Sequence, residues 1–256
     1  MTFWPHPRTV LQDGARELRL LTSLQEKKEI LHSLGVDRIE VLDFTREFSH
    51  LTAEEYLRDV VKEKLGGTAV AVGYDNRLGS DHCGPAEISD LASRLGLDCR
   101  IVERFGGEEM KVSSTSIRAA LAEGRVDDAA KMLGREYALH GVVVAGNRLG
   151  RTIGFPTANM QLYEPLKLLP GNGVYAVGVE TLGRHFRGMC NIGLRPTVSS
   201  TSARTIETNI FDFDEQIYGL DIRLSFIRKI RDERRFGSLE ELKAQLVEDR
   251  RACLEE

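Results

Sequence analysis

The strongest constraint on the fold is a change of pattern near residue 137 of this 256-residue chain. Before that point, apolar runs such as residues 68–75 ("TAVAVGYD") alternate with amphipathic helical patterns such as residues 84–97 ("GPAEISDLASRLGL"). After it, short β-favouring runs follow one another, separated only by Gly, Pro, Asn and Asp. Strand–helix alternation predicts a doubly wound parallel sheet, and closely spaced strands predict a small antiparallel barrel. We therefore expect an α/β domain followed by a β domain.

Caps and breakers place the expected elements. Ser23 and Glu26 form a capping-box pattern ahead of a helix that Gly35 ends, and Ser238 with Glu241 begins the closing helix, 238–256. The boundary falls near 125–136, so we expect domains at 1–125 and 137–256 with a linker at 126–136. The remaining expected helices are 52–67, 84–97, 114–124 and 126–135, and the expected strands are 37–44, 68–75, 98–105, 137–146, 173–183, 185–193, 205–213 and 221–231.

The composition limits the partners. Hydrophobic residues make up 41% of the chain and charged residues 29%, with a net charge of −4, which is typical of a globular protein without an attraction for phosphate backbones. The sequence shows neither an apolar run long enough to span a membrane nor a secretory signal pattern. The four cysteines are scattered, which favours reduced thiols. We expect a cytoplasmic protein that binds neither nucleic acid nor membranes.

The segment "GVVVAGNRLGRTIGFPTAN" is rich in glycine for a connection between strands. Gly146, Gly150 and Gly154 would let backbone N–H groups approach phosphate oxygens, and Arg151 would add a charge-assisted contact. The spacing matches neither a P-loop nor the dinucleotide-binding fingerprint, because no Gly-Lys-Ser/Thr and no predicted helix follow. A flexible hairpin turn is the alternative, and it is favoured on the glycines alone.

The residues that follow the loop favour a phosphate site. In an extended segment Thr157 and Asn159 point to the same side, and Pro156 restricts the backbone before them. A hydroxyl and an amide oxygen suit Mg²⁺ whose remaining ligands are nucleotide phosphates. A base is then needed for an attacking hydroxyl, and Glu207 in "RTIETNIFDF" is the candidate. A lone Glu in a strand is more often solvent-facing.

These residues resemble a known family. "GVVVAGNRLGRTIGFPTAN", "GVYAVGV", "NIGLRPTV", "ETNIFDFDEQIYG" and "IRDERRFGSLEEL" are together similar to the riboflavin kinase domain of bacterial bifunctional riboflavin kinase/FAD synthetases, across nearly all of 137–256. The resemblance implies a six-stranded barrel in which Thr157 and Asn159 contact Mg²⁺ and ATP. It also implies that Glu207 is the base toward the ribityl 5′-hydroxyl of riboflavin, giving FMN. Arg231 is a candidate for the flavin or the product phosphate, with a surface salt bridge as the alternative.

The resemblance extends upstream. "MTFWPHPR", "FSHLTAEEYL", "VAVGYDNRLG" and "VSSTSIRAAL" are similar to the adenylyltransferase half of the family, which implies a nucleotidyltransferase-like sheet. Hydroxyls of Ser113, Ser114 and Thr115 at a helix N-terminus, followed by Arg118, suit an ATP phosphate. A plain helix cap is the alternative.

Two departures bear on the second reaction. The family has a Gly-x-Phe-Asp-Gly-x-His-x-Gly-His segment ahead of the stretch that begins here at Thr2, and aromatic residues where Asn76 and Leu78 stand. We therefore expect an incomplete parallel sheet and riboflavin kinase activity without FMN adenylylation, and a lost N-terminal segment in preference to a tolerated deletion. A fully bifunctional enzyme and a non-catalytic flavin- or nucleotide-binding module are the alternatives.

Overall fold

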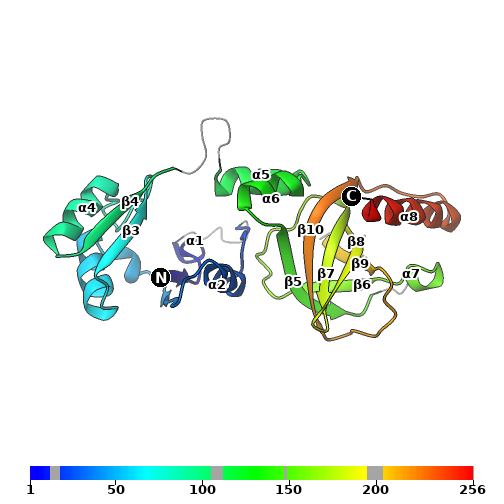
Figure 1. Cartoon of the computed structure of the whole chain (residues 1–256), viewed down its shortest axis with the longest axis horizontal. Coiled ribbons are helices and arrows are strands. Elements are labelled where there is room, and N and C mark those ends of the chain that lie inside the picture. Colours follow the sequence, from blue (N-terminus) through cyan, green and yellow to red (C-terminus); the bar gives the residue numbers. More distant parts are fainter. Residues whose placement is uncertain (12–17, 105–111, 147–148, 195–203, 256) are drawn as a thin grey trace. The chain divides into compact units, whose positions relative to one another are not determined.

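The computed structural model describes residues 1–11, 18–104, 112–146, 149–194 and 204–255 (Figure 1). The chain divides into two compact units, Met1–Leu18 with Leu24–Lys111 and Arg19–Ser23 with Val112–Glu256. Residues 147–148 of the glycine-rich loop and 195–198 of "NIGLRPTV" lie outside the described residues.

The first unit is built on two separate parallel strand pairs. Strand β1 pairs with β2, and β3 pairs with β4 through five residue pairs from Ala69↔Asp98 to Gly73↔Val102. The parallel pairing confirms the expected nucleotidyltransferase-like class. The bounds are β1 Thr2–Trp4, α1 Pro7–Leu11, α2 Leu24–Ser33, β2 Val41–Asp43, a 3₁₀ turn Phe48–His50, α3 Ala53–Glu55, a π-helix Tyr56–Lys64, β3 Ala69–Gly73, α4 Pro85–Arg94 and β4 Asp98–Val102.

The helix expected at 52–67 is present, but most of it is π-helical. Thr52 caps its start, because the threonine side chain accepts from Glu55 N and the Glu55 carboxylate accepts from Thr52 N. Further along, Leu65 N donates to Val60 O (3.0 Å), five residues back. Its buried side chains share one apolar cluster with residues of α4, with Leu42 of β2 and with Val70 and Val72 of β3. This core holds the first unit together.

The second unit is a closed six-stranded barrel in the order β10-β5-β6-β9-β8-β7, with every adjacent pair antiparallel. It confirms the barrel and closing helix expected for the second half. The bounds are α5 Ser114–Ala122, α6 Val126–Leu133, β5 Tyr137–Val144, α7 Leu149–Thr152, β6 Ala158–Leu162, β7 Gly173–Thr181, β8 Arg184–Leu194, β9 Arg204–Ile210, β10 Asp221–Arg231 and α8 Leu239–Leu254.

Helices α5 and α6 belong to the compact barrel unit. Ile117 and Leu121 of α5 and Ala129 of α6 are buried in the same apolar cluster as Leu139 and Phe226 of the barrel strands. The linker that we expected at 126–136 therefore falls inside a compact unit, because the apolar faces of these two helices are buried against the barrel.

A short piece of the N-terminal half also belongs to the barrel unit. Leu20 N donates to Leu166 O (2.7 Å), and Leu168 N donates to Leu20 O (2.9 Å). The buried ammonium of Lys167 donates to Leu21 O (2.9 Å) and lies over the Tyr137 ring. Residues 19–23 are thus fixed to the barrel unit by backbone and side-chain contacts.

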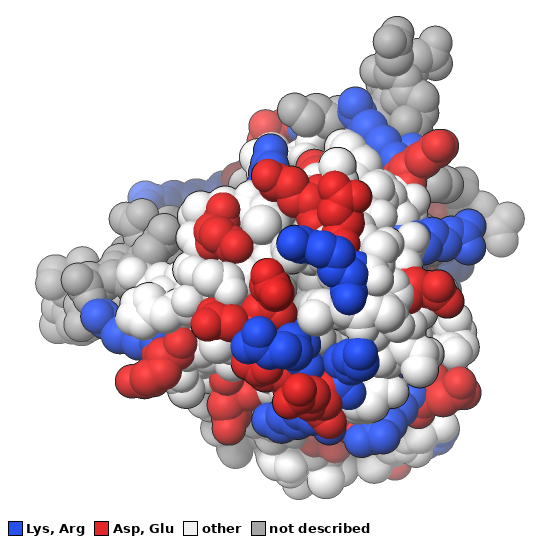
Figure 2. All heavy atoms as spheres, turned by 90° about the vertical axis from the view of Figure 1, so that its left-hand side faces the viewer, with Lys and Arg blue, Asp and Glu red and all other residues white. Residues whose placement is uncertain are grey.

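Charges on the surface are mixed in sign. On the face drawn in Figure 2, basic side chains lie beside acidic ones among the residues coloured there. Across the part of the chain that the structure describes, no helix has the length and apolar character that crossing a membrane requires.

Candidate active site

The glycine-rich loop leaves β5 and returns into β6 through the short helix α7, which the sequence did not predict because four residues carry no periodic signal. Its glycines make room for close contacts. A Cβ on Gly146 would lie 2.1 Å from Asn159 Nδ2, and one on Gly150 would lie 2.2 Å from Phe155 O. The backbone of the loop is therefore packed directly onto the "PTAN" segment.

Asn159 and Glu207 lie opposite one another in the β6–β9 ladder, which contains only the pairs Ala158↔Thr208 and Asn159↔Glu207. Asn191 of β8 is paired with Glu207 from the other side. Directly opposed residues share a face of the sheet, so Asn159, Glu207 and Asn191 form one polar row across three strands. Thr157 lies just before β6, at the open end of this short ladder.

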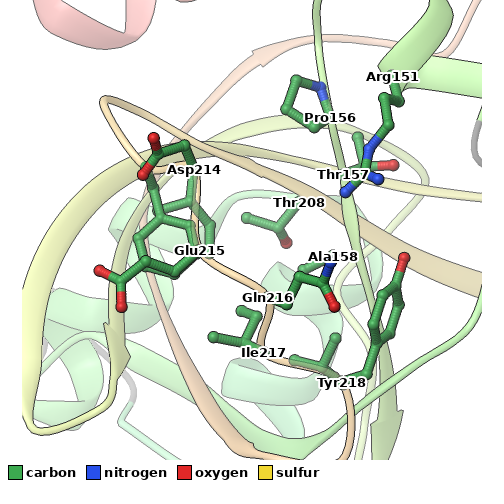
Figure 3. Close-up of a pocket in the computed structure, with 13 residues that line it drawn as sticks. Arg151, Pro156, Thr157, Ala158, Thr208, Asp214, Glu215, Gln216, Ile217 and Tyr218 are labelled. Atoms are coloured by element: carbon green, nitrogen blue, oxygen red, sulfur yellow. The ribbon is translucent and has the colours of Figure 1, made fainter.

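The first cavity, which we call the Arg151 cavity, has a volume of about 500 Å³ (Figure 3). Arg151 and Tyr218 lie on one side of it in the view of Figure 3, and Asp214 and Glu215 lie on the other. Its remaining lining residues are Val143, Pro156, Thr157, Ala158, Thr208, Ile210, Phe213, Gln216 and Ile217. One side thus offers a cation and the other offers carboxylates, which suits a ligand with an anionic end and a hydroxyl-bearing end.

The acidic side of this cavity is anchored to the start of β8. Glu215 accepts from Arg184 Nη1 (2.5 Å), and the Phe213 ring packs edge-on against Phe186 with centroids 5.1 Å apart. These contacts hold the loop between β9 and β10 against the barrel.

The second cavity, which we call the Glu207 cavity, has a volume of about 290 Å³. Glu207 and Asn209 reach it from β9, whereas Thr208 and Ile210 line the Arg151 cavity. Because side chains alternate along a strand, the two cavities lie on opposite faces of β9. The walls of the Glu207 cavity are largely apolar, and they are formed by Ile153, Phe155, Val174, Met189, Phe236, Leu242 and Leu246.

Thr157 lines both cavities and also a smaller recess formed with Gly146, Arg151, Asn159 and Tyr218. The structure thus brings together the predicted Arg151, Thr157, Asn159 and Glu207. Gly154 has a φ of +85°, a conformation that favours glycine, and it lies in the turn between α7 and "FPTAN".

Arg231 also lines the Glu207 cavity. Its guanidinium makes a two-point ion pair with Asp249 of α8, with Nη2–Oδ2 at 2.7 Å and Nε–Oδ1 at 2.9 Å. The Asp249 side chain is 1% exposed and the Arg231 side chain 19%. The salt bridge weighed as an alternative for Arg231 is therefore formed, but it is buried and not a surface pair.

The Ser113–Arg118 group lies on the barrel unit. Ser113 caps α5 by accepting from Ser116 N (3.1 Å), so the helix cap that we weighed as an alternative is present. Ser114 and Thr115 are exposed, and Arg118 Nε donates to Arg19 O (3.0 Å). Asn76 and Leu78 lie in a turn after β3, where Leu78 exchanges backbone hydrogen bonds with Cys83.

Sequence reasoning missed Asn209 and Asp249. Asn209 Nδ2 donates to Pro156 O (2.7 Å), which ties β9 to the "PTAN" segment. The alternation along β9 places Asn209 on the same face as Glu207, so that signal was available. Asp249 has the appearance of a surface residue between Glu248 and Arg250, and the sequence carries no sign of its burial.

A resident metal has few protein ligands here. Among the described residues no group of three or more His, Cys, Asp or Glu side chains is placed to hold a metal ion. The oxygens of Thr157 and Asn159 fit a hard cation that takes most of its ligands from water and phosphate, as Mg²⁺ does.

Both halves of the chain match known protein families. Residues 133–255 match the family model of riboflavin kinase, and residues 1–116 match that of FAD synthetase. The bifunctional riboflavin kinase/FMN adenylyltransferase of Bacillus subtilis is 35% identical over 99% of this chain and 80% of its own length. The enzyme of the same name from Escherichia coli K12 is 38% identical over 97% of this chain and 79% of its own length.

A solved structure described as a macrolide-efflux protein from Streptococcus pneumoniae superposes with a TM-score of 0.90 and 32% identity, over 98% of this chain and 81% of that one. Barrel, site and matches together define a transferase with a riboflavin kinase domain and a nucleotidyltransferase-like region. The chain belongs to the family of bifunctional riboflavin kinase/FMN adenylyltransferases. The family and fold class expected from the sequence are thereby confirmed.

Proposed function

We propose that this chain transfers the γ-phosphate of ATP to the 5′-hydroxyl of riboflavin, giving FMN and ADP. One observation carries the proposal: two cavities on opposite faces of β9, one with Arg151 and one with Glu207, share Thr157. A phosphate donor in the first cavity and a hydroxyl acceptor in the second would meet at Thr157, where the β6–β9 ladder ends. Phosphoryl transfer depends mainly on such positioning.

The chain's own groups have distinct roles in this scheme. Arg151 and the backbone of the loop from Gly146 through Gly150 to Gly154 contact the phosphates, and the carboxylates opposite face the ribose side of the nucleotide. The apolar walls of the Glu207 cavity take the flavin ring, with Arg231 beside it. The Glu207 carboxylate accepts the proton of the 5′-hydroxyl. At the same time the hydroxyl oxygen of riboflavin bonds to the γ-phosphorus, and ADP leaves.

Mg²⁺ is proposed as the cofactor, held by Thr157 and Asn159. When bound, it supplies positive charge to the phosphate oxygens of ATP. In the row Asn159–Glu207–Asn191 the Glu207 carboxylate is flanked by two amide side chains. It is not one of the proposed metal ligands, and its proposed role is that of the base.

FMN adenylylation is the second candidate, and the match of residues 1–116 to the FAD synthetase model favours it. For that reaction we propose that Ser114, Thr115 and Arg118 contact ATP. Asn76 and Leu78, which stand where the family has aromatic residues, are the feature of the chain that opposes it. Riboflavin, FMN and ATP are the proposed partners, and the cytoplasm is the proposed location.

The test is an incubation of the purified chain with riboflavin, ATP and Mg²⁺, with riboflavin, FMN and FAD resolved by chromatography. FMN without FAD supports the kinase proposal and the expectation of a disabled second reaction. FAD in addition supports the bifunctional candidate. No FMN from a folded chain that binds riboflavin overturns the kinase proposal and leaves the non-catalytic module.

A further inference from the structure

We propose that Asp249 of the C-terminal helix is a positioning residue for the flavin, because it fixes the Arg231 guanidinium in the wall of the Glu207 cavity. The inference deepens the proposed function and rests on it, since it takes riboflavin as the ligand of this cavity. Under this proposal α8 contributes to substrate binding as well as to the packing of the barrel unit.

The ion pair is unusually complete. Arg231 donates through Nε to both carboxylate oxygens, at 2.9 and 3.1 Å, and through Nη2 to Oδ2 at 2.7 Å. Gln245, one turn earlier on α8, donates to Asp249 Oδ1 at 2.8 Å. A buried carboxylate is tolerated only when paired and hydrogen-bonded in this way. The carboxylate is therefore fully engaged, and it holds the guanidinium plane in one orientation.

The guanidinium still has donors to offer. Arginine carries five N–H groups. Contacts to the described residues use Nε, one N–H of Nη2 toward Asp249, and one N–H of Nη1 toward Asp232 O (3.0 Å). Two N–H groups remain, on a side chain that lines the same cavity as Glu207. Riboflavin carries carbonyl and hydroxyl oxygens, and a fixed guanidinium donates to such acceptors at little entropic cost.

The position of α8 supports this assignment. Two apolar residues of the helix, Leu242 and Leu246, line the Glu207 cavity. The buried residues of α8 are Asp249 and Cys253, so the ion pair is the polar part of the contact that seats the helix. Asp249 thus seats the helix without lining the cavity itself, while Leu242 and Leu246 of the same helix and its partner Arg231 form part of the cavity wall.

A purely structural role for Asp249 makes a different prediction. If the pair only anchored α8, its loss would lower the melting temperature but leave riboflavin binding unchanged below that temperature. A positioning role requires weaker riboflavin binding from a protein that is still folded, with a smaller change in kcat.

The experiment compares the full chain with Asp249→Asn, which keeps the shape but removes the charge, and with Arg231→Lys and the double variant. Glu248→Gln is the matched control, because Glu248 is the preceding residue of α8 and makes an exposed pair with Arg251 (2.6 Å). The readouts are riboflavin affinity by flavin fluorescence quenching without ATP, kcat and KM for FMN formation, and the melting temperature.

We expect Asp249→Asn and Arg231→Lys each to raise the riboflavin Kd about tenfold, and the double variant to be no worse than either, because the two residues act as a unit. Glu248→Gln should match the unmodified chain. Unchanged riboflavin affinity in a folded Asp249→Asn overturns the inference. If that variant does not fold, Gln245→Leu, which removes only the bond to Oδ1, serves in its place and should weaken riboflavin binding in the same direction.

The affinity readout separates this inference from the proposed function. A chain that binds riboflavin but makes no FMN refutes the kinase proposal and still tests Asp249. A chain that makes FMN with equal riboflavin affinity in all variants supports the kinase and refutes the role of Asp249.

Discussion

Asn159 of β6 and Glu207 of β9 are directly opposed in a ladder of only two residue pairs, and Thr157 lies at the end of that ladder. The metal-binding amide and the base of the proposed reaction therefore share one face of the sheet. Thr157 at the end of this ladder lies within reach of both cavities.

Replacing Glu207 should remove the base without removing the flavin site. We expect Glu207→Gln to lower kcat by about 100- to 10,000-fold, because a positioned base contributes that much to a proton transfer. Riboflavin Kd should change by less than about threefold, since the amide is isosteric. Glu180→Gln on β7 is the control, because Glu180 lines neither cavity. A variant with more than a tenth of the normal kcat would exclude Glu207 as the base.

A methyl group at position 146 should displace Asn159, the proposed metal ligand. The Cβ of Gly146→Ala would lie 2.1 Å from Asn159 Nδ2, so the amide must move. We expect the Mg²⁺ concentration for half-maximal rate and the KM for ATP to rise about tenfold or more, as small misplacements in phosphoryl-transfer sites do. Gly178→Ala is the control, because its Cβ would meet only Ser225 Cβ at 3.8 Å. Equal Mg²⁺ dependence in both variants would contradict the assignment of Asn159.

The hydrogen bond from Asn209 to Pro156 should be required for stability. In Asn209→Asp a carboxylate faces the Pro156 carbonyl, and neither group can donate. We expect a loss of about 1–3 kcal/mol in the free energy of unfolding at pH 7. The loss should shrink as the pH falls, because a protonated Asp can again donate to Pro156 O. Urea unfolding at several pH values measures this, and an unchanged midpoint at pH 7 would show that the tie is dispensable.

Buried thiols should make the protein less stable in alkali. Burial raises the pKa of Cys190 to about 12 and that of Cys253 to about 11, from an ordinary value of 9.0. In the folded chain each thiol keeps its proton to a higher pH than in the unfolded chain. The contribution of the thiol to the free energy of unfolding is therefore complete below pH 9, and it is lost as the pH rises from 9 through the raised pKa. Each thiol should cost about 1.4 kcal/mol per pH unit over that range. Cys190→Ala should flatten the decline of stability between pH 9 and 10.5, and an identical slope in that variant would contradict this.

The barrel and the same-side placement of Thr157 and Asn159 follow from features that a sequence displays, whereas the pairing of Asn159 with Glu207 came from the structure. Period-two alternation and closely spaced turns predict the strands, and the positions of Thr157 and Asn159 follow from extended geometry. The helix α7 was not predicted, because four residues that include Gly150 have no periodicity and low helix propensity.

Long-range burial accounts for the rest of what was missed. Residues 19–23 attach to the barrel unit through Leu20 and Lys167, two positions far apart in the chain. In the sequence Asp249 has the pattern of a solvent-exposed helix residue. In the structure its side chain is buried and paired with Arg231 of β10. A local pattern carries no information about such partners.

The most direct test of the account is an equilibrium titration of Arg151→Ala with two ligands, Mg·ATP and riboflavin. If ATP occupies the Arg151 cavity and riboflavin the Glu207 cavity, the variant should bind Mg·ATP about tenfold or more weakly and riboflavin as tightly as the unmodified chain. Riboflavin binding that weakens while Mg·ATP binding is unchanged would contradict the assignment of the two cavities, and with it the transfer across Thr157.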